Sequence, residues 1–315
     1  SPRTVRHPGP VDAVIFDIGG VIIPWTPHRA FEQVMPAEQV PAFMERIGFA
    51  EWNHANDRLP SIVGAEEELV ARFPADEVGI RAYRRHFPLT IDAMVPGTPA
   101  IIAELQDAGV TIGALTNWAA EPFAVAREKF GILGRFQDIV ISGVEGIVKP
   151  DPAIYRLACE RLGVNPEQAV FIDDTAANAR AAAELGMTGL HFTTAERLRA
   201  DLVGLGLLAE RAPIGEPAYH WTTRADWESA VSDGYYPWSS RGLDYLGEGF
   251  VHCSFGHQLA GIRQLLYGDL TDAELVLLRL EPSAGLPIVV EDDYPHLFAP
   301  LPMDAAVVEP STVAG

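Results

Sequence analysis

Four short segments, far apart in the chain, carry side chains that could act together on a phosphoryl group. They are residues 16–21 (FDIGGV), 115–117 (LTN), 148–150 (VKP) and 171–174 (FIDD). Together they supply three aspartates, a lysine and an adjacent hydroxyl and amide. Carboxylate oxygens are the hard ligands that Mg²⁺ binds, and cations and hydrogen-bond donors stabilise phosphoryl oxygens. We interpret the four segments as one site for a divalent metal and a phosphoryl group.

Three of these segments follow or end an apolar run, at residues 13–16, 112–115 and 169–172. Short apolar runs that end at a polar residue and precede a helix-like pattern predict buried parallel strands. In an open α/β sheet, ligands bind at the carboxyl ends of such strands. The sequence therefore predicts that the segments meet in one crevice at that edge of the sheet.

Strand-like and helix-like patterns alternate between residues 110 and 192, which predicts an α/β fold with a doubly wound parallel sheet. Between residues 24 and 95 the pattern is helical without strand-like alternation, which indicates an insertion after the first strand. Residues 209–217 are rich in proline and glycine and indicate a linker. We expect a first domain over residues 11–208, with the insertion as its cap, and a small α+β domain over residues 218–310.

The composition excludes several classes of protein. Of 315 residues, 23 are lysine or arginine and 43 are aspartate or glutamate, which gives a net charge of −20. Such a charge repels nucleic acids and anionic membranes, because binding to them depends on basic residues. No apolar stretch approaches the roughly 18 residues of a membrane span, and residues 1–8 lack the apolar core of a signal peptide. We expect a cytoplasmic monomer or homodimer that acts on a small metabolite and binds neither nucleic acid nor membrane.

In this order and at this spacing, the four segments resemble motifs one to four of the haloacid dehalogenase superfamily, whose members are mostly phosphatases. The resemblance covers roughly residues 11–195, and residues 145–155 and 171–178 carry most of it. It is closest to the N-terminal phosphatase domain of soluble epoxide hydrolase and to sugar-1-phosphate phosphatases. The resemblance implies a Rossmann-like fold, a helical cap that selects the substrate and a Mg²⁺-dependent phosphatase reaction.

The resemblance also implies roles for the acidic residues. Asp17 would attack phosphorus and form an aspartyl-phosphate, which divides the hydrolysis into two easier steps. Mg²⁺ would be held by Asp17, the backbone carbonyl of Gly19 and Asp174. Asp173 would join these metal-binding acids or act from outside them by orienting Lys149. The alternative for the Asp173–Asp174 pair is a solvated loop that caps the following helix.

Other residues would bind the substrate. Thr116 and Asn117 would donate hydrogen bonds to the phosphoryl oxygens, and Lys149 would neutralise the charge between nucleophile and substrate. His54 in the insertion and Trp118, directly after the second segment, are candidates for contacts with the rest of the substrate. The alternatives are an ordinary polar residue of the cap for His54 and a packed side chain for Trp118. Trp25 could likewise line the mouth of the pocket, because it follows the first segment closely.

Gly19 departs from the usual pattern of the superfamily. Most of its phosphatases carry an aspartate two residues after the nucleophile, which protonates the leaving group and later activates water. A glycine cannot transfer protons. The substrate could have a good leaving group, such as an anomeric or acyl phosphate; another acid, with His54 and Asp57 as candidates, could substitute; or the site could be slow, inactive or dehalogenating. Some similar sugar-phosphate phosphatases also have glycine at this position.

The leading hypothesis is a Mg²⁺-dependent phosphatase for a sugar or nucleotide phosphate, fused to a ligand-binding or transferase-like domain. One alternative is a dehalogenase or phosphonate hydrolase that uses the same Asp17. The Asp173–Asp174 pair argues against dehalogenation, since displacing a halide needs no cation. The other alternative is a catalytically degenerate protein that binds a ligand or partner, motivated by Gly19.

The C-terminal part resembles a small bacterial family of unknown function, DUF952. The segments that carry this likeness are residues 219–222 (YHWT), 249–254 (GFVHCS) and 295–302 (PHLFAPLP). The family is distantly similar to ADP-ribosyltransferases and RNA 2′-phosphotransferases, which implies an α+β fold with a nucleotide-sized cleft but no established reaction. At a period of two, His220 and Thr222 share one strand face, and so do His252 and Ser254. These four residues could hold a phosphate or ribose, or the histidines could be buried and hydrogen-bonded in a small core.

Overall fold

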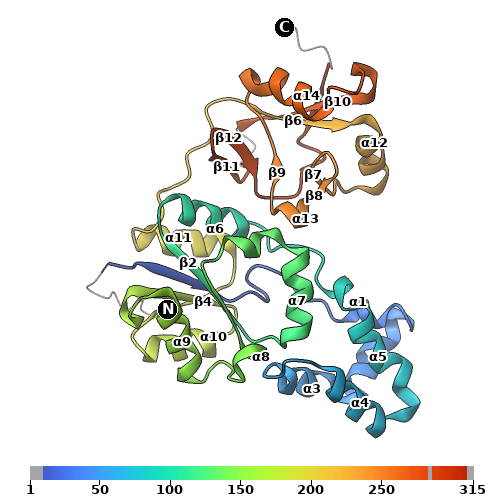
Figure 1. The fold of residues 1–315 in the computed structure, drawn as a ribbon, viewed down its shortest axis with the longest axis vertical. Helices are drawn as coiled ribbons and strands as arrows, with labels where there is room; N and C mark the ends of the chain where they lie inside the picture. Colours follow the sequence, from blue (N-terminus) through green and yellow to red (C-terminus); the bar gives the residue numbers. More distant parts are fainter. Residues whose placement is uncertain (1–9, 283–285, 311–315) are drawn as a thin grey trace. The chain divides into compact units, whose positions relative to one another are not determined.

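The chain folds into two compact units, described by a computed structural model over residues 10–282 and 286–310. The first unit contains residues 10–95, 109–129 and 133–201, and the second contains residues 96–108, 130–132 and 202–310. Figure 1 traces both units in the order of the sequence. Across the ranges that the structure describes, no helix has the length and apolar character needed to cross a bilayer.

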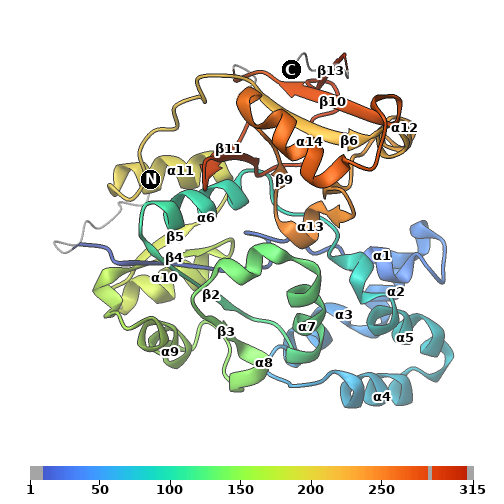
Figure 2. The same ribbon diagram turned by 45° about the horizontal axis from the view of Figure 1, so that its top comes forward.

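A five-stranded parallel sheet forms the centre of the first unit. In spatial order, its strands are β3 (Ile139–Ile141), β2 (Thr111–Thr116), β1 (Ala13–Phe16), β4 (Ala169–Asp173) and β5 (Thr188–His191). The chain builds one side of the sheet with β2 and β3 and the other side with β4 and β5, so the strand order reverses between β1 and β4 (Figure 2). This topology confirms the predicted parallel sheet. In such folds the reversal point is where ligands bind.

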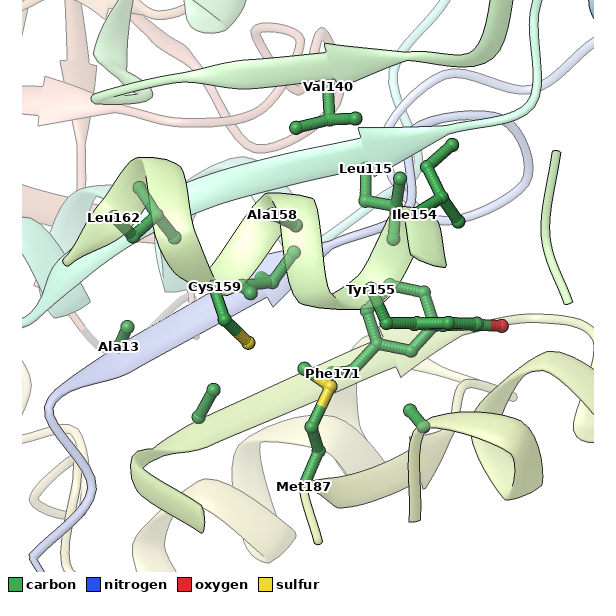
Figure 3. Packing of buried hydrophobic residues seen from close by; sticks show 13 residues of the cluster. Ala13, Leu115, Val140, Ile154, Tyr155, Ala158, Cys159, Leu162, Phe171 and Met187 are labelled. Atoms are coloured by element: carbon green, nitrogen blue, oxygen red, sulfur yellow. The ribbon is translucent and has the colours of Figure 1, made fainter. Parts of the chain in front are cut away.

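Helices pack on the sheet, and the burial that results explains why its strands are apolar. Those that follow β2 are α7 (Ala120–Lys129), α8 (Ser142–Glu145), α9 (Pro152–Leu162), α10 (Ala176–Glu184) and α11 (Ala195–Gly204). Tyr155 and Cys159 of α9 share a buried cluster with Ala13, Leu115 and Phe171, which belong to three neighbouring strands (Figure 3). The rings of Tyr155 and Phe171 meet edge to face with centroids 5.2 Å apart, a favourable arrangement for aromatic pairs. Burial of this kind selects continuous apolar runs over alternating ones.

The insertion after β1 is helical, as the sequence predicts. Its helices are α1 (His28–Phe31), α2 (Val40–Ile47), α3 (Phe49–Asn56), α4 (Val63–Arg72) and α5 (Glu77–Arg85). Aromatic side chains form its interior: Tyr83 of α5 lies 5.0 Å from Phe49 and 6.0 Å from Trp52, measured between ring centroids. This packing holds α3, which carries residues of the site described below, against α5.

The second unit consists of short antiparallel strands and helices, which confirms the predicted α+β class. One sheet has the order β13 (Val307–Glu309), β10 (Leu275–Leu280), β6 (Ala218–Thr223), and another has the order β11 (Ile288–Glu291), β12 (Tyr294–Leu297), β9 (Val251–His252). A third pairs β7 (Trp238–Ser240) with β8 (Leu243–Asp244). The helices are α6 (Thr98–Asp107), α12 (Arg224–Asp233), α13 (Tyr245–Glu248) and α14 (Leu259–Tyr267). Helix α6 belongs to this unit because Ala100 and Ala103 form a buried cluster with Val289 and Phe298.

Two of the residues predicted to bind a ligand in this unit, His220 and Thr222, are buried around Tyr236. The Tyr236 hydroxyl lies 2.7 Å from His220 Nε2 and 2.8 Å from Thr222 Oγ1. His220 Nδ1 lies 2.6 Å from the carbonyl oxygen of His252, and because a carbonyl can only accept, Nδ1 carries the ring proton. Burial lowers the pKa of His220 to about 4. The ring is therefore neutral and hydrogen-bonded at both nitrogens inside the unit.

The other two predicted residues have different surroundings. Ser254 is buried, and its backbone pairs with that of Tyr219. The side chain of His252 is 39% exposed, with Nε2 3.5 Å from a carboxylate oxygen of Glu248. Its ring lies beside that of His296, the residue directly opposite on β12, with centroids 5.3 Å apart. A ligand role for the second unit stays a prediction, and the half-exposed His252 is accessible to such a ligand.

The burial of neutral His220 predicts a loss of stability in acid. The ring binds a proton near pH 6.5 in the unfolded chain and only near pH 4 in the folded protein. The free energy of unfolding therefore keeps its full value above pH 6.5 and falls as the pH drops toward 4. The difference between these two pKa values corresponds to a loss of about 3 kcal/mol in the free energy of unfolding. We expect the protection factors of the β6 and β10 amides, which correct for the slower intrinsic exchange in acid, to fall as the pH drops over this range, and more steeply in the unaltered protein than in His220→Gln. The exposed His257→Gln is the control; equal pH dependence in all three proteins would contradict the prediction.

Candidate active site

The strand order brings the predicted residues to one edge of the parallel sheet. Asp17 directly follows β1, while Thr116 ends β2 and Asp173 ends β4. Because β1 pairs with β2 on one side and β4 on the other, these three strand ends are neighbours. Lys149 reaches them from the loop before α9. The four residues lie where the strand order reverses.

The ammonium group of Lys149 lies between two of the carboxylates. Its Nζ is 2.9 Å from Asp17 Oδ1, 2.7 Å from Asp173 Oδ2 and 3.4 Å from the Leu115 carbonyl oxygen. Only 1% of the side chain is exposed. Burial lowers the pKa of Lys149, but the charges of Asp17 and Asp173 outweigh it and raise the pKa above its ordinary value. A buried ammonium held in this way stays charged.

Asp17 has the environment of a carboxylate that needs a cation. Burial is the largest cause that raises its pKa, to about 7, and the charge of Lys149 opposes it. Asp173 and Asp174 add negative charge, and one carboxylate oxygen from each of the three aspartates lies within 4.8 Å of the others. Like charges this close repel one another unless a positive ion lies between them. The arrangement therefore fits a divalent cation.

Asp173 is held by several donors besides Lys149. The Thr175 backbone N–H donates to Asp173 Oδ1 at 2.8 Å, and Asn178 Nδ2 lies 3.2 Å from Oδ2. Asp173 is completely buried, whereas Asp174 is exposed. Asp173 is thus placed to orient Lys149, and Asp174 has the more open carboxylate.

Asn117 lies at the site with its amide engaged by the Lys149 backbone. Its Nδ2 donates to the Lys149 carbonyl at 3.1 Å, and its Oδ1 accepts from the Lys149 N–H at 2.8 Å. The contacts that the structure shows for Asn117 therefore position the lysine loop. Thr116 is buried at the end of β2. Both residues line a cavity of about 420 Å³ together with Asp17 and Lys149.

A second cavity, of about 520 Å³, is lined mainly by the cap and the loop after β2. Its aromatic walls are Trp25, Phe49, Tyr83 and Trp118. The structure therefore places Trp25 and Trp118 at the cavity, and it places His54 on the walls of both cavities. The four residues that line both are Gly19, His54, Asp57 and Asn117.

Two residues complete the site without having been assigned a role from the sequence. Gly20 has φ = +76°, and a Cβ atom there would lie 2.2 Å from Asp174 Oδ2. Only glycine lets the backbone approach the carboxylate this closely. Asn178, which contacts Asp173, lies within the segment that carries the fourth motif. The adjacent glycines of the first segment were the available signal for Gly20, whereas the contact of Asn178 depends on the start of α10.

Several curated proteins are similar to the first part of the chain. A sesquiterpene phosphatase from Aspergillus oryzae is 29% identical over 188 residues, which are 58% of this chain and 89% of that protein. The protein CbbY from Cereibacter sphaeroides is 28% identical over 228 residues, 65% of this chain and 99% of that protein. A phosphoserine phosphatase from Thermus thermophilus is 36% identical over 94 residues, 29% of this chain and 34% of that protein.

One solved structure and two family models are similar to parts of the chain. A haloacid dehalogenase family enzyme from Bacteroides thetaiotaomicron, in complex with magnesium and inorganic phosphate, has a TM-score of 0.44 and 18% identity, covering 58% of this chain and 95% of that one. The model of a protein family of unknown function, DUF952, matches residues 221–309. The model of the haloacid dehalogenase-like hydrolases matches residues 11–186, which contain all four segments of the site. The chain belongs to the haloacid dehalogenase-like hydrolases, and it is a hydrolase related to phosphatases.

Proposed function

We propose that the chain is a Mg²⁺-dependent phosphatase that hydrolyses a small phosphorylated metabolite through an aspartyl-phosphate on Asp17. The observation that carries this proposal is the buried Lys149 ammonium, 2.9 Å from Asp17 Oδ1. A carboxylate nucleophile and a phosphate ester are both anions, so they approach each other only beside a compensating cation. The phosphatases among the similar proteins support the same class of reaction.

The proposed reaction has two steps. An oxygen of Asp17 attacks phosphorus while the bond from phosphorus to the leaving oxygen breaks. Water then attacks the aspartyl-phosphate, which releases inorganic phosphate and restores the Asp17 carboxylate. Lys149 remains positively charged beside the reacting oxygen through both steps, and Thr116 at the cavity wall can donate its hydroxyl hydrogen to a phosphoryl oxygen.

The donor set supports Mg²⁺ as the cofactor. We propose Asp17, Asp174 and the Gly19 carbonyl as ligands, because hard oxygen donors suit this ion. Asp173 takes part through Lys149, since its carboxylate oxygens already meet the lysine and the Asn178 amide. The backbone at Gly20 leaves space beside Asp174 that any side chain would fill. When bound, the ion would neutralise charge on the carboxylates and on the phosphoryl group.

The larger cavity favours an ester with an apolar alcohol part. No lysine or arginine lines it, and its two acidic residues are Asp57 and Asp174. A second phosphate or a carboxylate on the substrate would therefore meet negative charge without compensation. The aromatic walls instead offer apolar surface to the substrate. The name of the similar sesquiterpene phosphatase also points to an apolar alcohol as the substrate's other part. In place of the sugar or nucleotide phosphate expected from the sequence, we propose monophosphates of neutral, largely apolar alcohols as the substrates.

Removal of the nucleophile tests the reaction class. We expect Asp17→Asn to lower phosphate release by about three orders of magnitude or more, because the covalent intermediate can no longer form. Chelation of Mg²⁺ should abolish release from the unaltered protein, as a phosphate assay with and without EDTA would measure. Halide release from 2-haloacids without metal would favour the dehalogenase alternative instead, and Mg²⁺ binding with no turnover would favour a degenerate binding protein.

Gly20→Ala tests the proposed metal site. The added methyl group would collide with the Asp174 carboxylate and displace it. We expect the affinity for Mg²⁺, measured by calorimetry, to fall by about 10- to 100-fold, as for other changes that misplace a metal ligand. Gly19→Ala is the matched control, because a Cβ atom there would meet nothing within 4 Å and the backbone carbonyl is kept. An affinity in Gly20→Ala equal to that of the unaltered protein would exclude the proposed role of Asp174.

A pair of substrates tests the cavity. Burial of about 100 Å² of apolar surface contributes about 2.5 kcal/mol, so kcat/KM for 2-phenylethyl phosphate should exceed that for glucose 6-phosphate more than tenfold. Trp25→Ala should reduce kcat/KM for the phenylethyl ester about tenfold and that for acetyl phosphate, which has no large apolar part, less than threefold. Val78→Ala, an exposed position of the cap, is the control. A preference for glucose 6-phosphate would contradict the proposed substrate class.

A further inference from the structure

The proposed phosphatase lacks an evident proton donor for the leaving group. An alkoxide leaves phosphorus slowly unless it is protonated as the bond breaks. Gly19 has no side chain, and a Cβ atom built there would meet nothing within 4 Å. The space directly beside the Gly19 Cα is therefore open. A proton donor could reach it from another wall of the cavity.

The residues that line the two cavities leave two candidates for the proton donor. The phosphoryl end of the site lies in the smaller cavity with Asp17 and Lys149, and the alcohol part of the substrate fits the larger, aromatic cavity. The leaving oxygen lies between these two parts of the substrate. Of the four residues that line both cavities, only His54 and Asp57 can transfer a proton.

Burial distinguishes these two residues. The side chain of Asp57 is 16% exposed, whereas that of His54 is 74% exposed, and the two are 3.6 Å apart between Nδ1 and Oδ2. Burial is the main cause that raises the pKa of Asp57 to about 6, and the charges of His54 and Lys149, which face it from α3 and from the loop before α9, oppose the rise. Tyr83 of α5 also interacts electrostatically with Asp57. A carboxyl group that titrates near neutral pH can both give and take a proton during turnover.

The backbone of Asp57 is fastened to the core of the first unit. Asp57 is the C-terminal cap of α3, and its carbonyl accepts a hydrogen bond from the Ser142 hydroxyl. The same hydroxyl oxygen accepts from the Trp118 N–H at 2.8 Å, directly after the second motif. Residues of the cap and of the core thus share one hydroxyl group beside the site.

The chain after Asp57 is fastened as well. The Ala120 N–H donates to the Leu59 carbonyl at 3.1 Å, and the Glu121 N–H donates to the Pro60 carbonyl at 3.0 Å. Gly143 permits this approach, because a Cβ atom there would lie 2.6 Å from the Leu59 oxygen. Asp57 is therefore held in place by the segment that directly follows Thr116 and Asn117.

We propose that Asp57 is the acid–base residue of this site and substitutes for the side chain that Gly19 lacks. The inference rests on the proposed phosphatase reaction. In the first step, the Asp57 carboxyl group gives its proton to the leaving oxygen as the bond to phosphorus breaks, and an alcohol departs. In the second step, the Asp57 carboxylate takes a proton from the water that attacks phosphorus. The bond from phosphorus to Asp17 breaks, and Asp57 is protonated again.

The test compares two substrates of similar size that differ in their need for an acid: 2-phenylethyl phosphate, a poor leaving group, and p-nitrophenyl phosphate, a good one. In single-turnover experiments with the Mg²⁺-loaded protein, Asp57→Asn should slow alcohol release from the phenylethyl ester by about 10²- to 10⁴-fold. The first release of nitrophenol should slow less than tenfold. In the unaltered protein, kcat/KM for the phenylethyl ester should fall as the pH rises through about 6, and this decline should be absent in Asp57→Asn.

Two further variants separate a chemical role from a structural one. Gly19→Asp in the Asp57→Asn background should recover at least tenfold of the lost rate on the phenylethyl ester, because the space beside position 19 is open. His54→Gln, at a residue that lines both cavities, should slow both substrates by a similar factor. Equal losses on both substrates in Asp57→Asn, or a substrate-selective loss in His54→Gln instead, would overturn the proposal. If the unaltered protein releases no phosphate from either ester, the proposed phosphatase reaction itself is contradicted. That result differs from the outcomes that contradict only the role of Asp57.

Discussion

A single buried ammonium group organises the site. Lys149 Nζ bridges Asp17 and Asp173, and its distance to the Phe171 ring centroid is 5.5 Å. A charge without solvent must be matched by partners, and removing one of them would leave the others uncompensated. Asn117 holds the Lys149 backbone and Asn178 contacts Asp173. The loops after β2 and β4 and the loop before α9 are therefore fixed by one electrostatic requirement.

The parallel sheet makes this arrangement possible. Each of β1, β2 and β4 ends at the same edge, and each delivers its polar residue one or two positions after its last buried apolar residue. The strands themselves are held by helices on the sheet, as the Tyr155–Phe171 contact illustrates. The scaffold is thus apolar and tightly packed, while the candidate site residues lie on the short segments that leave it, as in other open α/β folds.

The cap supplies the aromatic cavity walls that the edge of the sheet lacks. Its aromatic interior holds α3 and α5 together, and its aromatic side chains also form walls of the larger cavity. The hydroxyl of Ser142, shared between Asp57 and Trp118, joins the cap to the loop after β2. The residue proposed to protonate the leaving group and those proposed to meet the phosphoryl group are consequently positioned by one set of contacts.

The second unit shows that one residue type can have opposite surroundings within a small fold. His220 is buried and neutral within a hydrogen-bonded network, whereas His252, whose carbonyl accepts from His220, keeps a half-exposed ring beside Glu248 and His296. Strand periodicity places His220 and Thr222 of β6 together, but β9 ends at His252, so Ser254 does not share its strand, and periodicity does not say which face is covered. That depends on which strands pair and on what packs over them.

The sequence by itself determined the parallel sheet, the helical insertion and the four segments of the site, because buried strands and helices leave local apolar patterns and the polar residues follow directly at the strand ends. It also marked the missing side chain at Gly19. Only the tertiary structure decided that Asp57, 40 positions from Asp17, lies on the same cavity, that Asn117 binds the Lys149 backbone and that Gly20 makes room for Asp174. These contacts join residues distant in the chain, and their distances are set by packing between elements, which no local pattern records.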